Sequence, residues 1–71
     1  MFAQKKPALI TFLQESEVRW VSNTGAYSIQ KLPANEFRTE RFRAYRRGKL
    51  LNEHVLFEQA VEQCEAYEGM Q

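Results

Sequence analysis

The chain has 71 residues, of which 44% are hydrophobic and 27% charged, and its formal net charge is +1. A chain of this length forms at most one domain with a small core, which leaves little room for a deep active-site cleft. Cys64 is the single cysteine, which excludes an intramolecular disulfide, and one histidine besides leaves too few ligands for a structural zinc site. The near-neutral charge argues against bulk electrostatic binding of nucleic acid but permits a local basic face.

The N-terminal segment, residues 1–16, is expected to be a lead-in, either flexible or an extra strand, ahead of one domain over residues 17–68. Residues 8–14 fit both a strand and a short helical face, and we favour an extended segment. Their apolar run is too short for a signal peptide or a membrane span. We therefore expect a cytoplasmic protein without membrane contact.

A hairpin is the clearest predicted element. Residues 17–22 are strand-like, residues 22–25 contain the Asn and Gly typical of a turn, and residues 26–31 alternate again. In the second strand Tyr27 and Ile29 fall on one side of the sheet. Pro33 then ends it.

The next predicted strand is residues 41–45, with a start as early as Phe37 left open. Its alternation places Phe42 and Ala44 on one face. Residues 47–49 supply a turn, and Leu50 and Leu51 form a short fourth strand.

A helix is predicted at the C-terminal end, because apolar residues recur there at spacings of three and four: Phe57, Ala60, Val61, Cys64 and Tyr67. Gly69 is placed to end it. The fold class is therefore α+β, with a three- to four-stranded antiparallel sheet and one C-terminal helix packed on one face. The helix is expected to cover the sheet face that carries Tyr27, Ile29, Phe42 and Ala44, with Trp20 a further candidate.

Basic residues concentrate around the third predicted strand, where six fall within twelve positions: Arg38, Arg41, Arg43, Arg46, Arg47 and Lys49. Strand alternation predicts one exposed row, and the residues that we predict to bind a partner are Arg41, Arg43, Tyr45, Arg47 and Lys49. Guanidinium groups pair with phosphates or carboxylates, and a tyrosine ring stacks on a base or fills a protein pocket. The alternative is a solvated face whose arginines pair with Glu17, Glu36 or Glu40.

The start of the helix lacks a good cap. Asn52 is the best candidate N-cap, and its use would leave Val55 and Leu56 in the first helical turn. These two side chains cannot both face the core together with Phe57. They form either a secondary docking patch or an extra core contact.

Catalysis is not expected. His54 and Cys64 could form a Cys-His pair, but Cys64 falls on the apolar helix stripe, where a thiol is usually inert. The chain has no Asp, no glycine-rich phosphate loop and no metal-ligand cluster. We therefore expect a protein that is not an enzyme and holds no cofactor or metal.

The chain resembles small phage- and prophage-encoded regulatory proteins in which one helix follows an antiparallel sheet. The matching pieces are Tyr27-Ser28-Ile29, residues 41–46, Leu50-Leu51, and Glu58-Gln59-Ala60 running on to Cys64-Glu65. The outline is also similar to the AP2-type DNA-binding domain, in which a sheet presents arginines to DNA and one helix packs behind it. The resemblance covers about two-thirds of the chain and implies a regulatory binding role.

Taken together, these features predict a small regulatory protein of phage type that binds an acidic surface of a host protein. A component of the transcription machinery is the first candidate partner, and the protein would act as an inhibitor by covering a surface that another factor needs. Lys5 and Lys6 are possible additions to the binding face. DNA or RNA binding by the same row is the alternative. We expect a monomer or a weak homodimer paired through a sheet edge.

Overall fold

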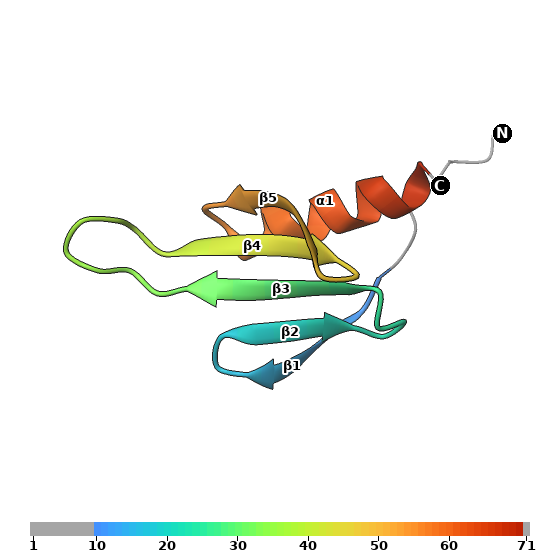
Figure 1. The fold of residues 1–71 in the computed structure, drawn as a ribbon, viewed down its shortest axis with the longest axis horizontal. Coiled ribbons are helices and arrows are strands. Elements are labelled where there is room, and N and C mark those ends of the chain that lie inside the picture. The colour runs from blue at the N-terminus through green and yellow to red at the C-terminus, as the bar shows by residue number, and fades with distance from the viewer. Residues whose placement is uncertain (1–9, 71) are drawn as a thin grey trace, which may run out of the picture.

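The computed structural model describes residues 10–70 and shows one five-stranded antiparallel sheet followed by one helix (Figure 1). The strands lie in the sheet in chain order, so a hairpin joins each to the next. The elements are β1 Phe12–Ser16, β2 Arg19–Ser22, β3 Tyr27–Leu32, β4 Arg41–Arg46, β5 Lys49–His54 and α1 Phe57–Gly69. The predicted α+β class with a C-terminal helix is confirmed.

The predicted number of strands, three or four, is wrong. The expected extended segment at the N-terminal side forms β1, which pairs with β2 across an irregularity between Gln14 and Ser16. The fourth predicted strand, Leu50 and Leu51, is in fact the six-residue β5, whose register with β4 shifts between Ala44 and Tyr45. Both are edge strands with exposed polar residues, so their sequences lack the alternation that identifies a half-buried strand. Residues 1–9, with Lys5 and Lys6, lie outside the described part.

The core lies between α1 and the face of β3 and β4 that the sequence predicts. Tyr27, Ile29, Phe42 and Ala44 are buried there, and the helix contributes Ala60 and Cys64. Ala44, Ala60 and Cys64 have no exposed surface, and their small side chains let the helix lie close to β4. The helix packs against β3, β4 and β5. Within residues 10–70 the other face of the sheet therefore has no helix over it.

An aromatic cluster fixes the N-terminal end of α1. The Trp20 ring centroid lies 4.8 Å from that of Phe57 and 6.2 Å from that of Phe42, and the Phe42–Phe57 distance is 5.8 Å. Aromatic pairs at these distances contribute about 0.5–1.5 kcal/mol each beyond the area that they bury. Trp20 thus belongs to the helix-covered face, as predicted.

A polar contact fixes the C-terminal end of α1. The Tyr27 hydroxyl donates to Glu68 Oε1 over 2.7 Å, and the Arg46 guanidinium lies 5.9 Å and 5.3 Å from the ring centroids of Tyr27 and Tyr67. Burial raises the pKa of Tyr27, and the hydrogen bond to Glu68 raises it further. Arg46 is therefore part of the packing on the helix side and does not belong to an exposed basic row.

The predicted N-cap, Asn52, is wrong. Asn52 pairs with Ala44 inside β5, because β5 continues through His54. The N-cap position is occupied by Leu56, whose side chain cannot accept a hydrogen bond. Its backbone N–H donates to Gln59 Oε1 over 3.2 Å, which is one half of a capping box. Residues 55 and 56 therefore lie before the helix.

Candidate interaction surface

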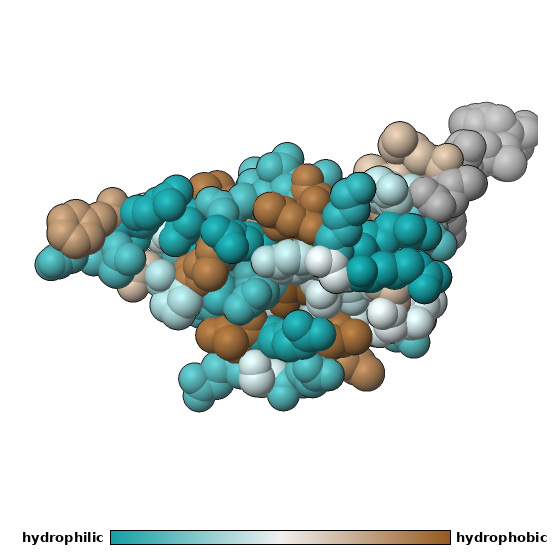
Figure 2. Space-filling view, in the orientation of Figure 1, coloured by the Kyte–Doolittle hydropathy of each residue, from teal (hydrophilic) through white to brown (hydrophobic). Residues whose placement is uncertain are grey.

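The sheet face opposite the helix, here called the open face, is the candidate functional surface. Side chains alternate along each strand, so this face carries the residues that do not point at α1. Figure 2 views the molecule from this side and shows apolar residues separated by hydrophilic ones. The residues on it are Leu13, Arg19, Val21, Ser28, Gln30, Leu32, Arg41, Arg43, Tyr45, Leu50 and Glu53.

An apolar row crosses all five strands of the open face. Leu13 pairs with Val21, Val21 with Ser28, Ser28 with Tyr45, and Tyr45 with Leu50. The two ends of the row are uncovered, since Leu13 is 65% exposed and Leu50 is 49% exposed. The polar Ser28 lies at the centre of the row, with apolar or aromatic side chains on both sides of it. Apolar side chains on a sheet face that α1 does not cover are typical of a contact surface.

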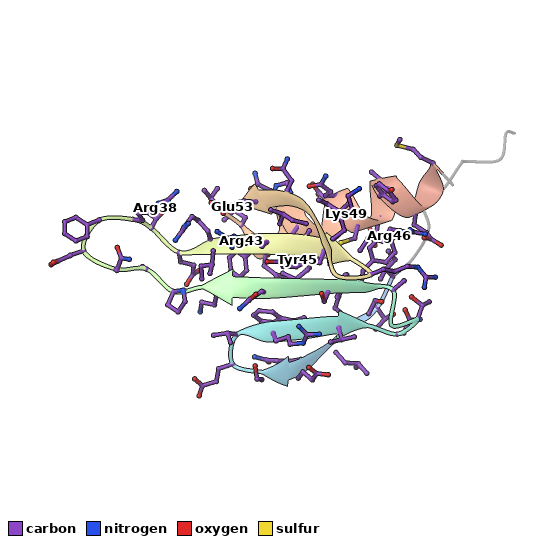
Figure 3. All side chains as sticks on the ribbon, viewed as in Figure 1. Arg38, Arg43, Tyr45, Arg46, Lys49 and Glu53 are labelled. Carbon is purple, nitrogen blue, oxygen red and sulfur yellow. The ribbon has the colours of Figure 1, made fainter. Side chains whose placement is uncertain are left out.

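An arginine cluster, consisting of Arg38, Arg41, Arg43 and the carboxylate of Glu53, lies beside the apolar row. Arg43 Nε donates to Glu53 Oε1 over 3.0 Å and Arg41 Nη1 to Oε2 over 3.3 Å, while Arg38 Nη2 is 3.8 Å from Oε2. Figure 3 shows Arg38, Arg43 and Glu53 gathered near the β3–β4 loop, with Tyr45 further along β4. The hydrogen bond from Arg43, followed by that from Arg41, lowers the pKa of Glu53, although partial desolvation opposes this.

The partners of these arginines differ from the prediction. Sequence reasoning paired them with Glu17, Glu36 or Glu40, whereas Glu53 on β5 is the carboxylate between them. Glu40 instead lies 3.2 Å from Lys31. The difference arises because β5 is longer than expected and therefore brings Glu53 opposite Arg43. Three cations around one anion leave the cluster with a net positive charge.

The predicted basic row is only partly formed. Arg41, Arg43 and Tyr45 share the open face, with side-chain exposures of 13% for Arg41 and 39% for Arg43. Lys49 pairs with Arg46, so its side chain lies on the helix side of the sheet, on the opposite face from Arg41, Arg43 and Tyr45. The alternation fails here because Arg47 and Gly48 form a turn that ends β4.

Arg47 occupies a conformation that is unusual for its residue type. Its φ is 51° and that of Gly48 is 83°, so both central residues of the turn are left-handed. Such turns favour Asn-Gly, and a left-handed Arg costs about 1–2 kcal/mol. The exposed Arg47 side chain extends the basic surface past the end of β4. A strained residue at an exposed position motivates a functional hypothesis for it.

A shallow hollow of about 350 Å³ lies in the middle of the open face. It forms where the small Ser28 side chain separates Val21 from Tyr45. Arg19 and Arg47 also line it. The hollow is large enough to receive one side chain from a partner.

A second apolar patch lies near the β3–β4 loop. Val55 and Leu56 are 58% and 52% exposed, so of the two alternatives for this pair the structure does not support burial in the core. Phe37 is 86% exposed in the loop, and it lines a hollow of about 360 Å³ together with Val55. The Asn35 side chain accepts hydrogen bonds from the N–H groups of Phe37 and Arg38 and so orders the loop. The sequence leaves open a strand that starts at Phe37, whereas Phe37 lies in the loop. Asn35, a residue type that favours turns, is the feature of the sequence that indicates this loop.

Cys64 and His54 are the two residues that the sequence offers as a nucleophilic pair. Burial raises the pKa of the Cys64 thiol to about 11, so the nucleophilic thiolate is strongly disfavoured at neutral pH. The His54 ring contacts the Gln63 side chain across the space between β5 and α1. Within residues 10–70 no three His, Cys, Asp or Glu side chains gather to hold a metal ion. Over the same residues no helix is long and apolar enough to cross a membrane.

No protein-family model matches the chain, and neither does any curated protein or solved structure. The class that the fold defines is an α+β domain with a single antiparallel sheet and one C-terminal helix on β3–β5. The resemblances noted in the sequence stay predictions. The residues of the open face are therefore the features of this chain that bear on its function.

Proposed function

We propose that this chain is a small, non-catalytic regulatory protein that binds a partner protein through its open face. The observation that carries the proposal is the apolar row beside the arginine cluster on a sheet face without a helix over it. Binding interfaces combine an apolar centre with a polar rim, and Tyr and Arg dominate their energetic centres. Tyr45 and Arg43 lie next to each other in such an arrangement.

The charge of the cluster favours a partner with acidic side chains. Arg43 uses its Nε to bond Glu53, and a guanidinium group has five N–H donors, so donors remain for a second carboxylate. Arg47 adds a further cation beyond the end of β4. A partner carboxylate placed between Arg43 and Arg47 would lie over the hollow beside Tyr45.

The alternative is DNA or RNA binding by the same face, because three of its members are suited to phosphates and bases: Arg41, Arg43 and Tyr45. Two observations favour protein instead. Glu53 places a negative charge inside the cluster, where it would repel phosphate. The apolar row gives a phosphate backbone nothing to bind, whereas it complements an apolar protein surface.

The test is a capture experiment from a nuclease-treated bacterial lysate, followed by binding measurements with the purified captured protein. The matched variants are Leu50→Asp and Val55→Asp, which place the same charge at two similarly exposed apolar sites, one on the open face and one outside it. We expect Leu50→Asp to weaken binding at least about tenfold, the size of an interface hot spot, and Val55→Asp to retain it. A component of the transcription machinery is the first partner to look for.

Opposite results would contradict the proposal. If only Val55→Asp lost the partner, the secondary patch near Phe37 would be the binding site. If the chain instead bound a bare duplex at micromolar concentration, with an affinity that fell steeply with salt, the nucleic-acid alternative would hold.

A further inference from the structure

A groove of about 620 Å³ runs between β5 and α1, on the side of the molecule away from the open face. It forms because α1 packs more against β4 than against the edge strand β5. Figure 1 shows α1 lying along β4 and β5. The groove is lined by Asn52, His54, Gln59, Gln63, Ala66 and Met70, with Glu62 and Tyr67 beside them.

One stripe of the helix forms a wall of this groove. Gln59, Gln63, Ala66 and Met70 are spaced by four, three and four residues, so they lie along one side of α1 and its C-cap. Eleven residues of helical rise span about 16 Å. An extended peptide advances about 3.3 Å per residue, so the groove accommodates about five residues of a strand.

The other wall is a strand edge with hydrogen-bonding capacity. In the part of the chain that the structure describes, β5 is the last strand of the sheet and pairs with β4 alone. The Glu53 backbone N–H donates to the Asn52 side-chain Oδ1 over 2.8 Å, so this N–H is engaged by a side chain of its own strand. Asn52 is exposed and can be displaced. A backbone carbonyl of an added strand could then accept the hydrogen bond from the Glu53 N–H in place of Asn52 Oδ1.

The charge of the helix selects the occupant. α1 contains four glutamates and no Lys or Arg. Glu62 lines the groove, and Glu58 precedes it by one helical turn on the same side. Glu68 is engaged by the Tyr27 hydroxyl on the core side. An extended segment rich in Lys or Arg complements this wall.

We propose that the groove binds an extended basic segment of a second protein, which adds to β5 as a sixth strand. Main-chain hydrogen bonds to the edge of β5 hold the segment. Side chains at alternate positions of the segment face α1, and the basic side chains among them reach Glu62 and Glu58. This site is separate from the open face and does not depend on the proposed function.

The probe is a capped seven-residue peptide that alternates Val and Lys, titrated into the full chain and followed by backbone and side-chain amide NMR signals. The expected signals to shift are the Glu53 amide and the side-chain amides of Asn52, Gln59 and Gln63. Two control peptides separate the contributions. The first has Glu in place of Lys, and the second has N-methyl groups along one backbone edge, which removes its strand hydrogen bonds.

The matched protein variants carry equal changes in net charge. Glu58→Lys with Glu62→Lys reverses the groove charge, whereas Glu17→Lys with Glu36→Lys reverses two exposed carboxylates elsewhere. We expect the first pair to weaken peptide binding about fivefold or more and the second to change it less than twofold, since exposed charge pairs contribute up to about 1 kcal/mol each. Circular dichroism of both pairs confirms that each is folded.

Several results would overturn the proposal. Equal binding of the Lys and Glu peptides would show that charge does not select the segment. Unchanged binding of the N-methylated peptide would show that the segment does not add to β5 as a strand. Shifts confined to the open face would place the site elsewhere. Absence of any shift at millimolar peptide would also contradict it. Shifts of β5 and α1 amides that require both Lys side chains and free backbone N–H groups would support it.

Discussion

Glu53 is the residue that organises the open face, because its carboxylate lies among Arg38, Arg41 and Arg43. The hydrogen bond from Arg43 is the first cause of its lowered pKa. A carboxyl group whose pKa is lower in the folded state stabilises the fold above its unfolded pKa of about 4.3, and that contribution is lost as the pH falls through the folded pKa. The stabilisation is therefore complete near neutral pH.

Glu53→Gln should accordingly lower the free energy of unfolding at pH 7, and the difference from wild type should shrink as the pH falls through the lowered pKa of the folded wild-type carboxyl, which then becomes protonated. Urea unfolding at pH 7 and pH 3 measures this. Glu36→Gln, an exposed loop carboxylate, is the control and should show a smaller difference at pH 7. If the difference in free energy of unfolding between wild type and Glu53→Gln stayed constant with pH, the charge of Glu53 would not be the cause of its stabilising effect.

Arg47 gives a prediction in which stability and binding change in opposite directions. Arg47→Asn relieves the left-handed conformation and should stabilise the fold by about 1 kcal/mol, which raises the Tm of a domain this size by roughly 4–8 °C. The same change removes a cation from the open face and should weaken partner binding. Calorimetry and binding of one protein sample test both. Arg47→Lys is the control: it should keep the wild-type Tm, and a gain in stability there would argue against conformational strain.

The buried Cys64 thiol is expected to react slowly with thiol reagents. With a pKa of about 11 against an ordinary value of 9.0, its thiolate fraction at pH 8 is roughly a hundredfold lower than in the unfolded chain. An aromatic disulfide reagent should therefore react slowly with the folded protein and rapidly in urea. Because the folded pKa is raised, stability should also fall as the pH rises above about 9.0. Rapid reaction of the folded chain would show that Cys64 is accessible.

At the scale of elements, the start of α1 is its weakest point. Leu56 has the extended backbone of an N-cap, with φ −125° and ψ 144°, but no oxygen to accept a hydrogen bond from the first helical turn. Leu56→Ser supplies one and should raise the free energy of unfolding by about 0.5–1 kcal/mol. Thermal unfolding measures the gain. Val55→Ser makes the same apolar-to-polar change one residue earlier and should not stabilise, so equal gains would refute the capping argument.

The elements that the sequence predicts well are those with one buried side. The β2–β3 hairpin, β4 and α1 follow directly from the alternation of Tyr27 with Ile29 and the helical spacing from Phe57 to Tyr67. β1 and the second half of β5 could not be predicted, because an edge strand takes its hydrogen bonds from a neighbour while its side chains stay exposed. Because the sequence does not predict the full length of β5, it also does not predict the ion pairs of the open face. Without a strand that reaches Glu53, neither the ion pairs of Arg43 nor the helix-side position of Lys49 can be foreseen.

At the scale of the whole molecule, the two sides of the sheet differ in charge. The open face carries the arginine cluster, while all the charged side chains of the helix beyond the sheet are acidic. The near-zero net charge hides this separation, which is why composition alone predicts so little about partners. One side suits an acidic protein surface, and the other suits a basic extended segment.

The two proposed sites should act independently, because the groove and the hollow of the open face share no lining residue. Glu53 is the one residue used by both, with its carboxylate in the arginine cluster and its backbone N–H at the edge of β5. Leu50→Asp should weaken the partner of the open face without affecting the Val-Lys peptide, and Glu58→Lys with Glu62→Lys should do the reverse. In the combined variant the affinity for each ligand should fall as much as in the corresponding single-site variant, to within about 0.5 kcal/mol. Titration of each ligand in the presence of the other measures this. If the affinity for one ligand changed strongly when the other was bound, the two sites would be coupled.

The measurement that tests the central claim most directly is an NMR footprint of the isotope-labelled chain with its captured protein partner. The account predicts that the signals most broadened or shifted belong to the apolar row and the arginine cluster, with Tyr45 and Arg43 foremost. Signals from the outer side of α1 should change least. A footprint centred on α1, or on Phe37 and Val55, would contradict the claim that the open face is the binding surface.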